Sequence, residues 1–143
     1  MRIQQLSLFI ENRSGSLSEV CRTLTENNIN LRALSLVDTK QFGILRLIVK
    51  DWERARDLME SAGFVVKVTE VFALRVDDRP GGLGEVLSIL DEAGSNIEYM
   101  YAFTYGSQDK AIMVFRFEDP EAAVDSLRKH DIDIARGIDF FGV

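Results

Sequence analysis

The chain contains one segment twice. Residues 11–20 read ENRSGSLSEV and return at 77–86 as DDRPGGLGEV, an offset of 66 residues that also places Asn30-Leu31 on Asn96-Ile97. In each copy, an arginine, a small residue or proline, glycine and leucine stand between a strand-like and a helix-like segment. The repeat therefore predicts two modules, each with a junction suited to bind a small anion or zwitterion.

The repeat divides the 143 residues into predicted modules at 1–69 and 70–143. Each module is near the lower size limit for an independent hydrophobic core, so we expect the two to share a core or an interface. The net charge of −6 and the absence of a basic stretch argue against nucleic acid and anionic membranes as partners. No apolar run approaches the ~20 residues of a membrane helix.

The N-terminal residues carry no signal-peptide pattern, and Cys21 is the only cysteine. A single cysteine excludes an internal disulfide and suits a reducing compartment. We therefore expect a cytoplasmic protein.

Each repeat begins with a strand pattern and continues with a helix pattern. Apolar residues alternate along 6–10 and 72–76, which predicts strands with one buried face. Apolar residues then recur at helical spacing from Leu17 and from Leu83. Ser16 with Glu19 predicts a capping box at the first helix, and Gly82 with Glu85 predicts a weaker version at the second.

The remainder of each repeat completes a βαββαβ pattern. Further strands are predicted at 30–37, 44–49, 96–105 and 111–117, and 64–76 is nearly all strand-forming. Second helices are predicted from near Asp51 and from Asp119-Pro120. The fold class is therefore α+β: two ferredoxin-like βαββαβ modules in tandem, with antiparallel sheets and helices on one face. Residues 138–141 (IDFF) suggest one extra edge pairing.

These residues resemble the ACT domain, the amino-acid-binding regulatory module of many biosynthetic enzymes. The resemblance rests on the turn 78–83 (DRPGGL), a following helix and 93–97 (AGSNI), and recurs less fully at 12–17 and 27–31. It covers essentially the whole chain and implies paired modules with amino-acid sites at their interfaces. Ser14 departs from the pattern, which prefers proline. No catalytic domain accompanies the modules, so we expect any regulated enzyme to be a separate chain.

The turns offer the chemistry that a free amino acid requires. The first N–H groups of a helix and its dipole suit a carboxylate, and glycines at 15, 81 and 82 allow close approach to the backbone. Side-chain oxygens of Asn12, Asp78, Asn30 and Asn96 suit an ammonium group. The predicted ligand-binding residues are Asn12, Arg13, Ser14, Gly15, Ser16, Leu17, Asn30, Leu31, Asp78, Arg79, Pro80, Gly81, Gly82, Leu83, Asn96 and Ile97.

Several of these residues also have a purely structural interpretation. A glycine in a strand–helix turn can be present simply because the backbone there has a positive φ. An asparagine at a helix end can be present simply as a helix cap. Arg13 and Arg79 either hold a carboxylate or pair with Glu11 and Asp77. Alternating aromatic residues form either a ligand platform or, as we favour, a packing surface. These aromatics are Tyr99, Tyr101, Phe103 and Tyr105.

No catalytic or metal-binding residues are predicted, and no cofactor is expected. Cys21 lies on an apolar helix stripe, which predicts a core residue, and His130 is expected at the surface near a helix end. The missing Cys-x-x-Cys pattern argues against a metal chaperone. An acylphosphatase-like hydrolase using Arg79 and Asn96 stays as a minor alternative, although the glycine-rich signature around the arginine is absent. The acidic charge opposes an RNA-recognition domain.

We therefore predict a non-catalytic regulatory protein, not an enzyme. It binds a free amino acid at the interface between its modules, forms a homodimer and modulates a separate metabolic enzyme. The alternative from another class is a protein–protein interaction module that needs no ligand.

Overall fold

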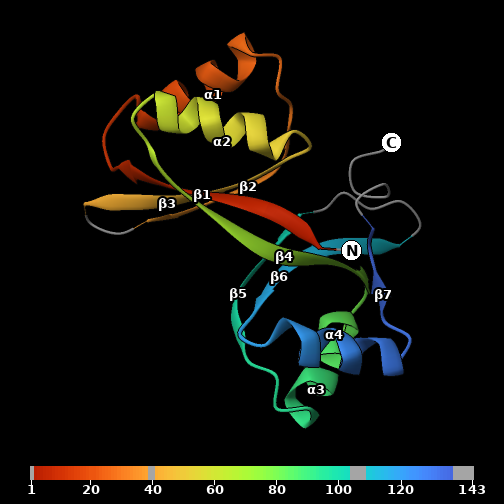
Figure 1. Cartoon of the computed structure of the whole chain (residues 1–143). Helices are drawn as coiled ribbons and strands as arrows, with labels where there is room; N and C mark the ends of the chain where they lie inside the picture. Colours follow the sequence, from red (N-terminus) through yellow and green to blue (C-terminus); the bar gives the residue numbers. More distant parts are fainter. Residues whose placement is uncertain (1, 39–40, 104–108, 137–143) are drawn as a thin grey trace. The chain divides into compact units, whose positions relative to one another are not determined.

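A computed structural model describes residues 2–38, 41–103 and 109–136. The elements repeat the order βαββαβ, with β4 closing the first repeat and opening the second (Figure 1). This confirms the predicted α+β fold. The elements are β1 (Ile3–Glu11), α1 (Ser16–Glu26), β2 (Leu31–Asp38), β3 (Phe42–Val49), α2 (Trp52–Ser61), β4 (Val65–Asp77), α3 (Gly82–Glu92), β5 (Ile97–Phe103), β6 (Lys110–Phe117), α4 (Pro120–Lys129) and β7 (Asp133–Ile134).

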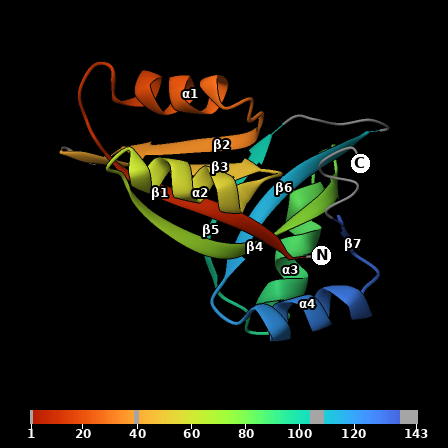
Figure 2. The same ribbon diagram turned by 45° about the horizontal axis from the view of Figure 1, so that its top comes forward.

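The N-terminal unit comprises Gln4–Glu70. Its strands follow the order β2-β3-β1-β4, and β3 pairs antiparallel with both β1 and β2. Helices α1 and α2 cover one face of this sheet (Figure 2). The alternating apolar residues of the strands meet the apolar stripes of the helices there, as their periodicity predicts. This core contains Leu6, Leu8, Ile10, Val20, Leu24, Ile29, Leu45, Leu47, Val49, Ala55 and Met59.

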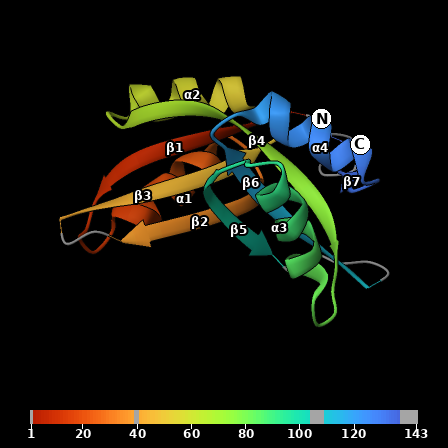
Figure 3. The ribbon, with the colours of Figure 1, turned by 90° about the horizontal axis from the view of Figure 1, so that it is seen from below.

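The C-terminal unit comprises Met1–Ile3 and Val71–Val143. Its strands follow the order β7-β4-β6-β5, the same arrangement as in the N-terminal unit, and each pair is antiparallel. Helices α3 and α4 cover one face of this sheet (Figure 3). The core contains Phe72, Leu74, Val76, Val86, Leu90, Phe115, Phe117, Ala123, Val124 and Leu127.

The starts of α1 and α3 differ from the predicted capping pattern. The N-caps are Gly15 and Gly81, with φ of 93° and 86°, each one residue before the predicted position. The capping-box prediction for Ser16 was therefore wrong. The left-handed conformation at the N-cap favours glycine, and Ser16 enters the helix as its first residue. At α4 the predicted helix start is confirmed, since Asp119 is the N-cap and Pro120 is the first helical residue; the Asp119 side chain also accepts a hydrogen bond from the Ala122 N–H.

Two side-chain predictions have different outcomes. Cys21 is only half-buried, because the buried line of α1 runs through residues 16, 20 and 24 and leaves position 21 at its margin. The prediction of a core cysteine was therefore wrong. His130 is exposed at the C-terminal end of α4, as expected. Tyr105 and residues 138–141 lie outside the described residues.

Candidate functional site

The first turn, residues 11–17, joins β1 to α1. It is anchored to the start of β3, because the Asn12 N–H donates to the Gln41 carbonyl at 3.0 Å. Gly15 is the N-cap of α1 and has no side chain with which to bond the first helical N–H groups. Those groups give the helix start a partial positive charge, directed at the space beside the turn.

The buried hydroxyl of Ser16 has no hydrogen-bond partner among the described residues. The residue is 4% exposed, and its Oγ forms no hydrogen bond with any described residue. A buried hydroxyl without a partner costs about 1–3 kcal/mol. The first turn therefore holds a buried donor and acceptor that the described residues leave unsatisfied.

Two cavities of the N-terminal unit meet at Ser16. The larger, of about 220 Å³, extends from the first turn to the corner between α2 and β4. The smaller, of about 70 Å³, extends toward β2 and β3. The larger cavity is smaller than the ~300–1,000 Å³ typical of pockets for drug-sized ligands. Ile10, Glu11, Arg13 and Ser16 line both cavities.

The larger cavity combines donors with acidic acceptors. Glu11 and Glu19 both line it, beside the N-terminal end of α1. Phe9 and Phe64 supply apolar surface at its border. Positive helix N–H groups next to two carboxylates complement a zwitterion better than a simple anion.

Arg13 has a weak partner in this structure. Its Nε lies 3.0 Å from Glu11 Oε2, and the two side chains are 59% and 66% exposed. An exposed ion pair of this kind contributes about 0–1 kcal/mol. A ligand carboxylate can therefore compete with Glu11 for the guanidinium at little cost.

The second turn, residues 77–83, has a similar backbone but a closed set of polar contacts. Arg79 Nη2 donates to both Glu85 carboxylate oxygens, at 2.8 and 2.9 Å, and to Asp77 Oδ2 at 3.3 Å. Lys110 forms an ion pair with the other oxygen of Asp77. The charged groups of this turn thus bind one another.

These contacts shift two pKa values. The hydrogen bond and charge of Lys110, helped by Arg79, lower the pKa of Asp77 below its usual value. The hydrogen bond and charge of Glu85, followed by those of Asp77, raise the pKa of Arg79. Both shifts favour the charged forms and so maintain the network at neutral pH.

Gly82 occupies the position that Ser16 occupies in the first turn. A Cβ at Gly82 would lie 2.0 Å from the Asp77 carbonyl oxygen. The second turn therefore has no room for the side chain that the first turn presents to its cavities.

The predicted residues of the two turns differ in burial. Ser16 and Gly82 are buried, and Leu17 and Leu83 are half-buried. The others are exposed: Asn12, Arg13, Ser14, Gly15, Asp78, Arg79, Pro80 and Gly81.

The remaining predicted residues lie away from the turns of their own units. Asn30 and Leu31 follow the C-terminal end of α1, whose 11 residues separate them from the first turn by roughly 16 Å. Asn96 and Ile97 stand in the same relation to α3 and the second turn. The Asn96 side chain donates to Glu118 Oε2 at 3.0 Å. Each unit thus separates the predicted residues into two groups.

This separation bears on the enzyme alternative. Arg79 and Asn96, the pair required by the acylphosphatase hypothesis, lie at opposite ends of α3. Within the described ranges, no three or more histidine, cysteine, aspartate or glutamate side chains cluster as metal ligands. No described helix is both long and apolar enough to cross a membrane.

The profile of the family described as "ACT domain pair" matches residues 1–140. The chain belongs to this family. A protein from Bacteroides thetaiotaomicron of known crystal structure is 36% identical, with a TM-score of 0.93, covering 100% of this chain and 98% of that one. The ligand-free regulatory subunit of aspartate kinase from Thermus thermophilus is 17% identical, with a TM-score of 0.66, covering 90% and 93%. That second likeness shows the fold alone. No curated protein matched.

Sequence reasoning missed several lining residues of this ACT pair's candidate site, including Phe9, Glu11 and Glu19. Ala62, Gly63 and Phe64 line the larger cavity with the first turn. No motif marks them. The signal was topological, because a βαββαβ module brings the end of its second helix to the same end of the sheet as its first turn.

Proposed function

We propose that this ACT domain pair is a non-catalytic regulatory protein that binds a free amino acid at the first turn and modulates a separate metabolic enzyme. The observation that carries the proposal is the buried, unpartnered hydroxyl of Ser16, which lines both cavities. The N-terminus of α1 alone would be a weak argument. The hydroxyl adds an independent, unpartnered polar group on a residue that lines the same space.

The ligand carboxylate accepts hydrogen bonds from the first N–H groups of α1 and from the Ser16 hydroxyl. Arg13 releases Glu11 and binds the ligand carboxylate instead. This exchange costs little because the Arg13–Glu11 ion pair is exposed to solvent. The released Glu11 and the neighbouring Asn12 then accept hydrogen bonds from the ammonium group. This arrangement uses groups that lie within one unit and line the observed cavities.

Specificity for an amino acid follows from the mixture of charges. Glu11 and Glu19 would repel phosphate or another multiply charged anion, while an ammonium group satisfies them. Phe9, which is 46% exposed, and Phe64 border the volume left for the ligand side chain. An apolar side chain gains most there, because it removes aromatic surface from water.

The homodimer belongs to the same proposal. β2 ends the sheet path of the N-terminal unit, and its Leu34 and Leu36 are 48% and 47% exposed. A second copy packed along β2 would cover these side chains. Leu36 also lines the smaller cavity, so dimer contacts and ligand contacts would meet at one residue. Light scattering with and without ligand tests this point, and a monomer mass at micromolar concentration in both samples contradicts it.

A thermal-melt screen against the twenty amino acids tests ligand binding. A ligand at ~100 times its dissociation constant adds about 2.7 kcal/mol to the free energy of unfolding. The proposal predicts a selective rise in melting temperature with the wild-type chain and a much smaller rise with Ser16→Ala. A flat screen at millimolar ligand would instead favour the ligand-independent interaction module.

A further inference from the structure

The larger cavity of the N-terminal unit reaches the C-terminal end of α2 as well as the start of α1. Ala62 is the C-cap of α2, and it lines the cavity with the following Gly63 and Phe64. Ser16, the first residue of α1, lines the same cavity. One cavity within one unit therefore lies beside the positive end of one helix and the negative end of another.

The end of α2 carries two carbonyl groups that the helix does not use. The N–H groups of Gly63 and Phe64 each donate back to the helix at 3.0 Å, and the Gly63 φ of 93° permits this reversal of the chain. The carbonyls of Ser61 and Ala62 accept no backbone hydrogen bond among the described residues. Both residues are exposed, so a donor on a ligand can approach them.

The negative end of α2 has no basic side chain to offset it. The last turn of this helix, which the structure describes in full, contains no lysine or arginine. Glu11 and Glu19 line the same cavity and add to its negative charge. The corresponding helix of the second copy, α4, ends instead with Arg128 and Lys129. Basic groups at that place stabilise a helix end, and in the first copy a ligand cation can supply this charge.

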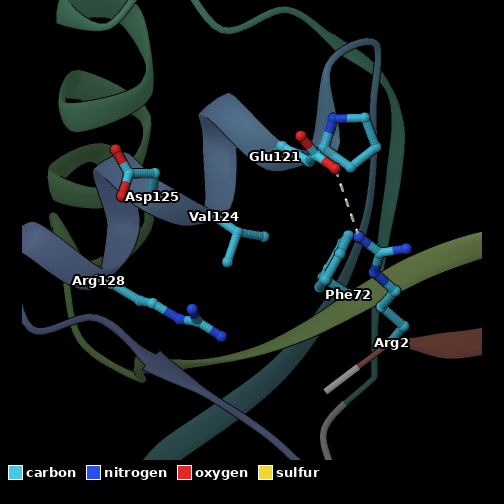
Figure 4. Close-up of a pocket in the computed structure, with 7 residues that line it drawn as sticks. Arg2, Phe72, Glu121, Val124, Asp125 and Arg128 are labelled. Carbon is cyan, nitrogen blue, oxygen red and sulfur yellow. Dashed lines mark ion pairs between the residues drawn. The ribbon is translucent and has the colours of Figure 1, made fainter.

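The cavity described in the C-terminal unit is placed differently. It has a volume of about 240 Å³ and lies between α4 and β4 (Figure 4). Its lining balances two arginines with the carboxylates of Glu121 and Asp125, and no residue of the second turn, 77–83, takes part in it. The cavity of the N-terminal unit, by contrast, connects its turn to a helix end.

We infer that the C-terminal end of α2 helps to bind the ammonium group of the ligand and makes the site selective for primary amino acids. This inference rests on the function proposed for the first turn, which places the ligand carboxylate at the start of α1. An ammonium group has three donors. Glu11 and Asn12 accept two of these hydrogen bonds, and the Ala62 carbonyl accepts the third. An amino acid with a substituted nitrogen loses one of them.

Nuclear magnetic resonance of the full chain tests the inference with leucine and N-methylleucine as probes. Leucine should cause saturable shifts of the Ala62 carbonyl carbon and of the Gly63 amide, which belong to one peptide group. The Ser16 and Leu17 amides should shift with the same affinity. N-methylleucine keeps the positive charge but has one donor fewer, so it should bind about tenfold more weakly.

The outcomes separate this inference from the proposed function. Leucine shifts at Ser16 and Leu17 without shifts at Ala62 and Gly63 would overturn the inference and leave the proposed function intact. Equal affinities of the two probes would do the same. The absence of saturable shifts at Ser16 and Leu17 would overturn the proposed function and this inference with it.

A charge transferred from the second copy provides an independent test. Ser61 and Lys129 are the last residues of α2 and α4, so Ser61→Lys gives α2 the end that α4 has. The new ammonium group competes with the ligand, and leucine binding should weaken about threefold in a chain that stays folded. Thr25→Lys is the matched control, because it adds the same charge at an exposed position in the last turn of α1, away from the cavity lining. Equal leucine affinities of the two variants would overturn the inference.

Discussion

The two turns of this ACT pair share a backbone and differ in chemistry. Both place a glycine N-cap at positive φ before an 11-residue helix. In the first turn a buried hydroxyl has no partner and an arginine has one exposed partner. In the second turn the corresponding hydroxyl is absent and the arginine is held by two carboxylates. The two copies of the repeat therefore have the same backbone conformation at this turn, but their polar side chains make different contacts.

The residue on the neighbouring strand accounts for part of this difference. Glu11 lies opposite Phe42 in the sheet, whereas Asp77 lies opposite Lys110. The phenylalanine leaves Glu11 available to Arg13 or to a ligand ammonium. The lysine instead binds Asp77 and completes the network around Arg79. The difference between Phe42 and Lys110 at this cross-strand position therefore contributes to the different polar contacts of the two turns.

The largest expected effect comes from introducing serine at position 82, which corresponds to Ser16 of the first turn. Gly82→Ser places a Cβ 2.0 Å from the Asp77 carbonyl oxygen, so it should lower the free energy of unfolding by roughly 3 kcal/mol. The reverse change, Ser16→Gly, should cost less than about 1 kcal/mol. Urea denaturation of both variants checks this. Equal losses would show that the two turns are equally packed.

Ser16→Ala separates ligand binding from stability. It removes an unpartnered buried hydroxyl, so the free protein should keep its stability or gain up to about 1 kcal/mol. Affinity for the amino acid found by the melt screen should fall about tenfold. Calorimetric titration and denaturation measure the two quantities.

Ser95→Ala is the matched control, because the Ser95 hydroxyl is also buried and unpartnered but does not line the first turn's cavities. It should leave affinity unchanged. A loss of stability in Ser16→Ala with unaltered affinity would contradict the proposed role of the hydroxyl.

The arginines should respond unequally to the same substitution. Arg13→Gln should weaken amino-acid binding by roughly threefold to tenfold, because one charge-assisted contact is lost. Arg79→Gln should leave binding unchanged, since its guanidinium is occupied by Glu85 and Asp77. Titration calorimetry of both variants measures this, and equal effects would indicate that both turns bind ligand.

The smallest expected effect concerns acid. The pKa of Asp77 is lowered in the folded chain, so its contribution to stability is present at neutral pH and is lost as the pH falls through that lowered pKa. Lys110→Met removes the main cause and should raise the Asp77 pKa toward its ordinary value. Carboxyl carbon resonances of Asp77 followed during acid titration measure the shift. An unchanged Asp77 pKa in this variant would show that Lys110 does not stabilise the charged form of Asp77 in the second turn.

The sequence predicted the fold well because periodicity and turn residues agree in both copies. Alternation at 6–10 and 72–76, followed by helical spacing from Leu17 and Leu83, identified the strands and helices. The starts of α1 and α3 were predicted one residue late, because the capping pattern does not anticipate a glycine N-cap at positive φ.

The site was less accessible to sequence reasoning. The repeat indicated both turns, although contacts with residues distant in sequence contribute to the difference between them. The pairing of Asp77 with Lys110 depends on strand register, and the unpartnered state of Ser16 depends on what packs around it. Neither is encoded in a local motif.

The most direct test of the account is an amide resonance titration of the full chain with the amino acid that raises its melting temperature. The account predicts saturable shifts at Ser16, Leu17 and Gly63, with the amides of Gly82 and Leu83 unmoved. Saturable shifts confined to the second turn, or none at either turn, would contradict it.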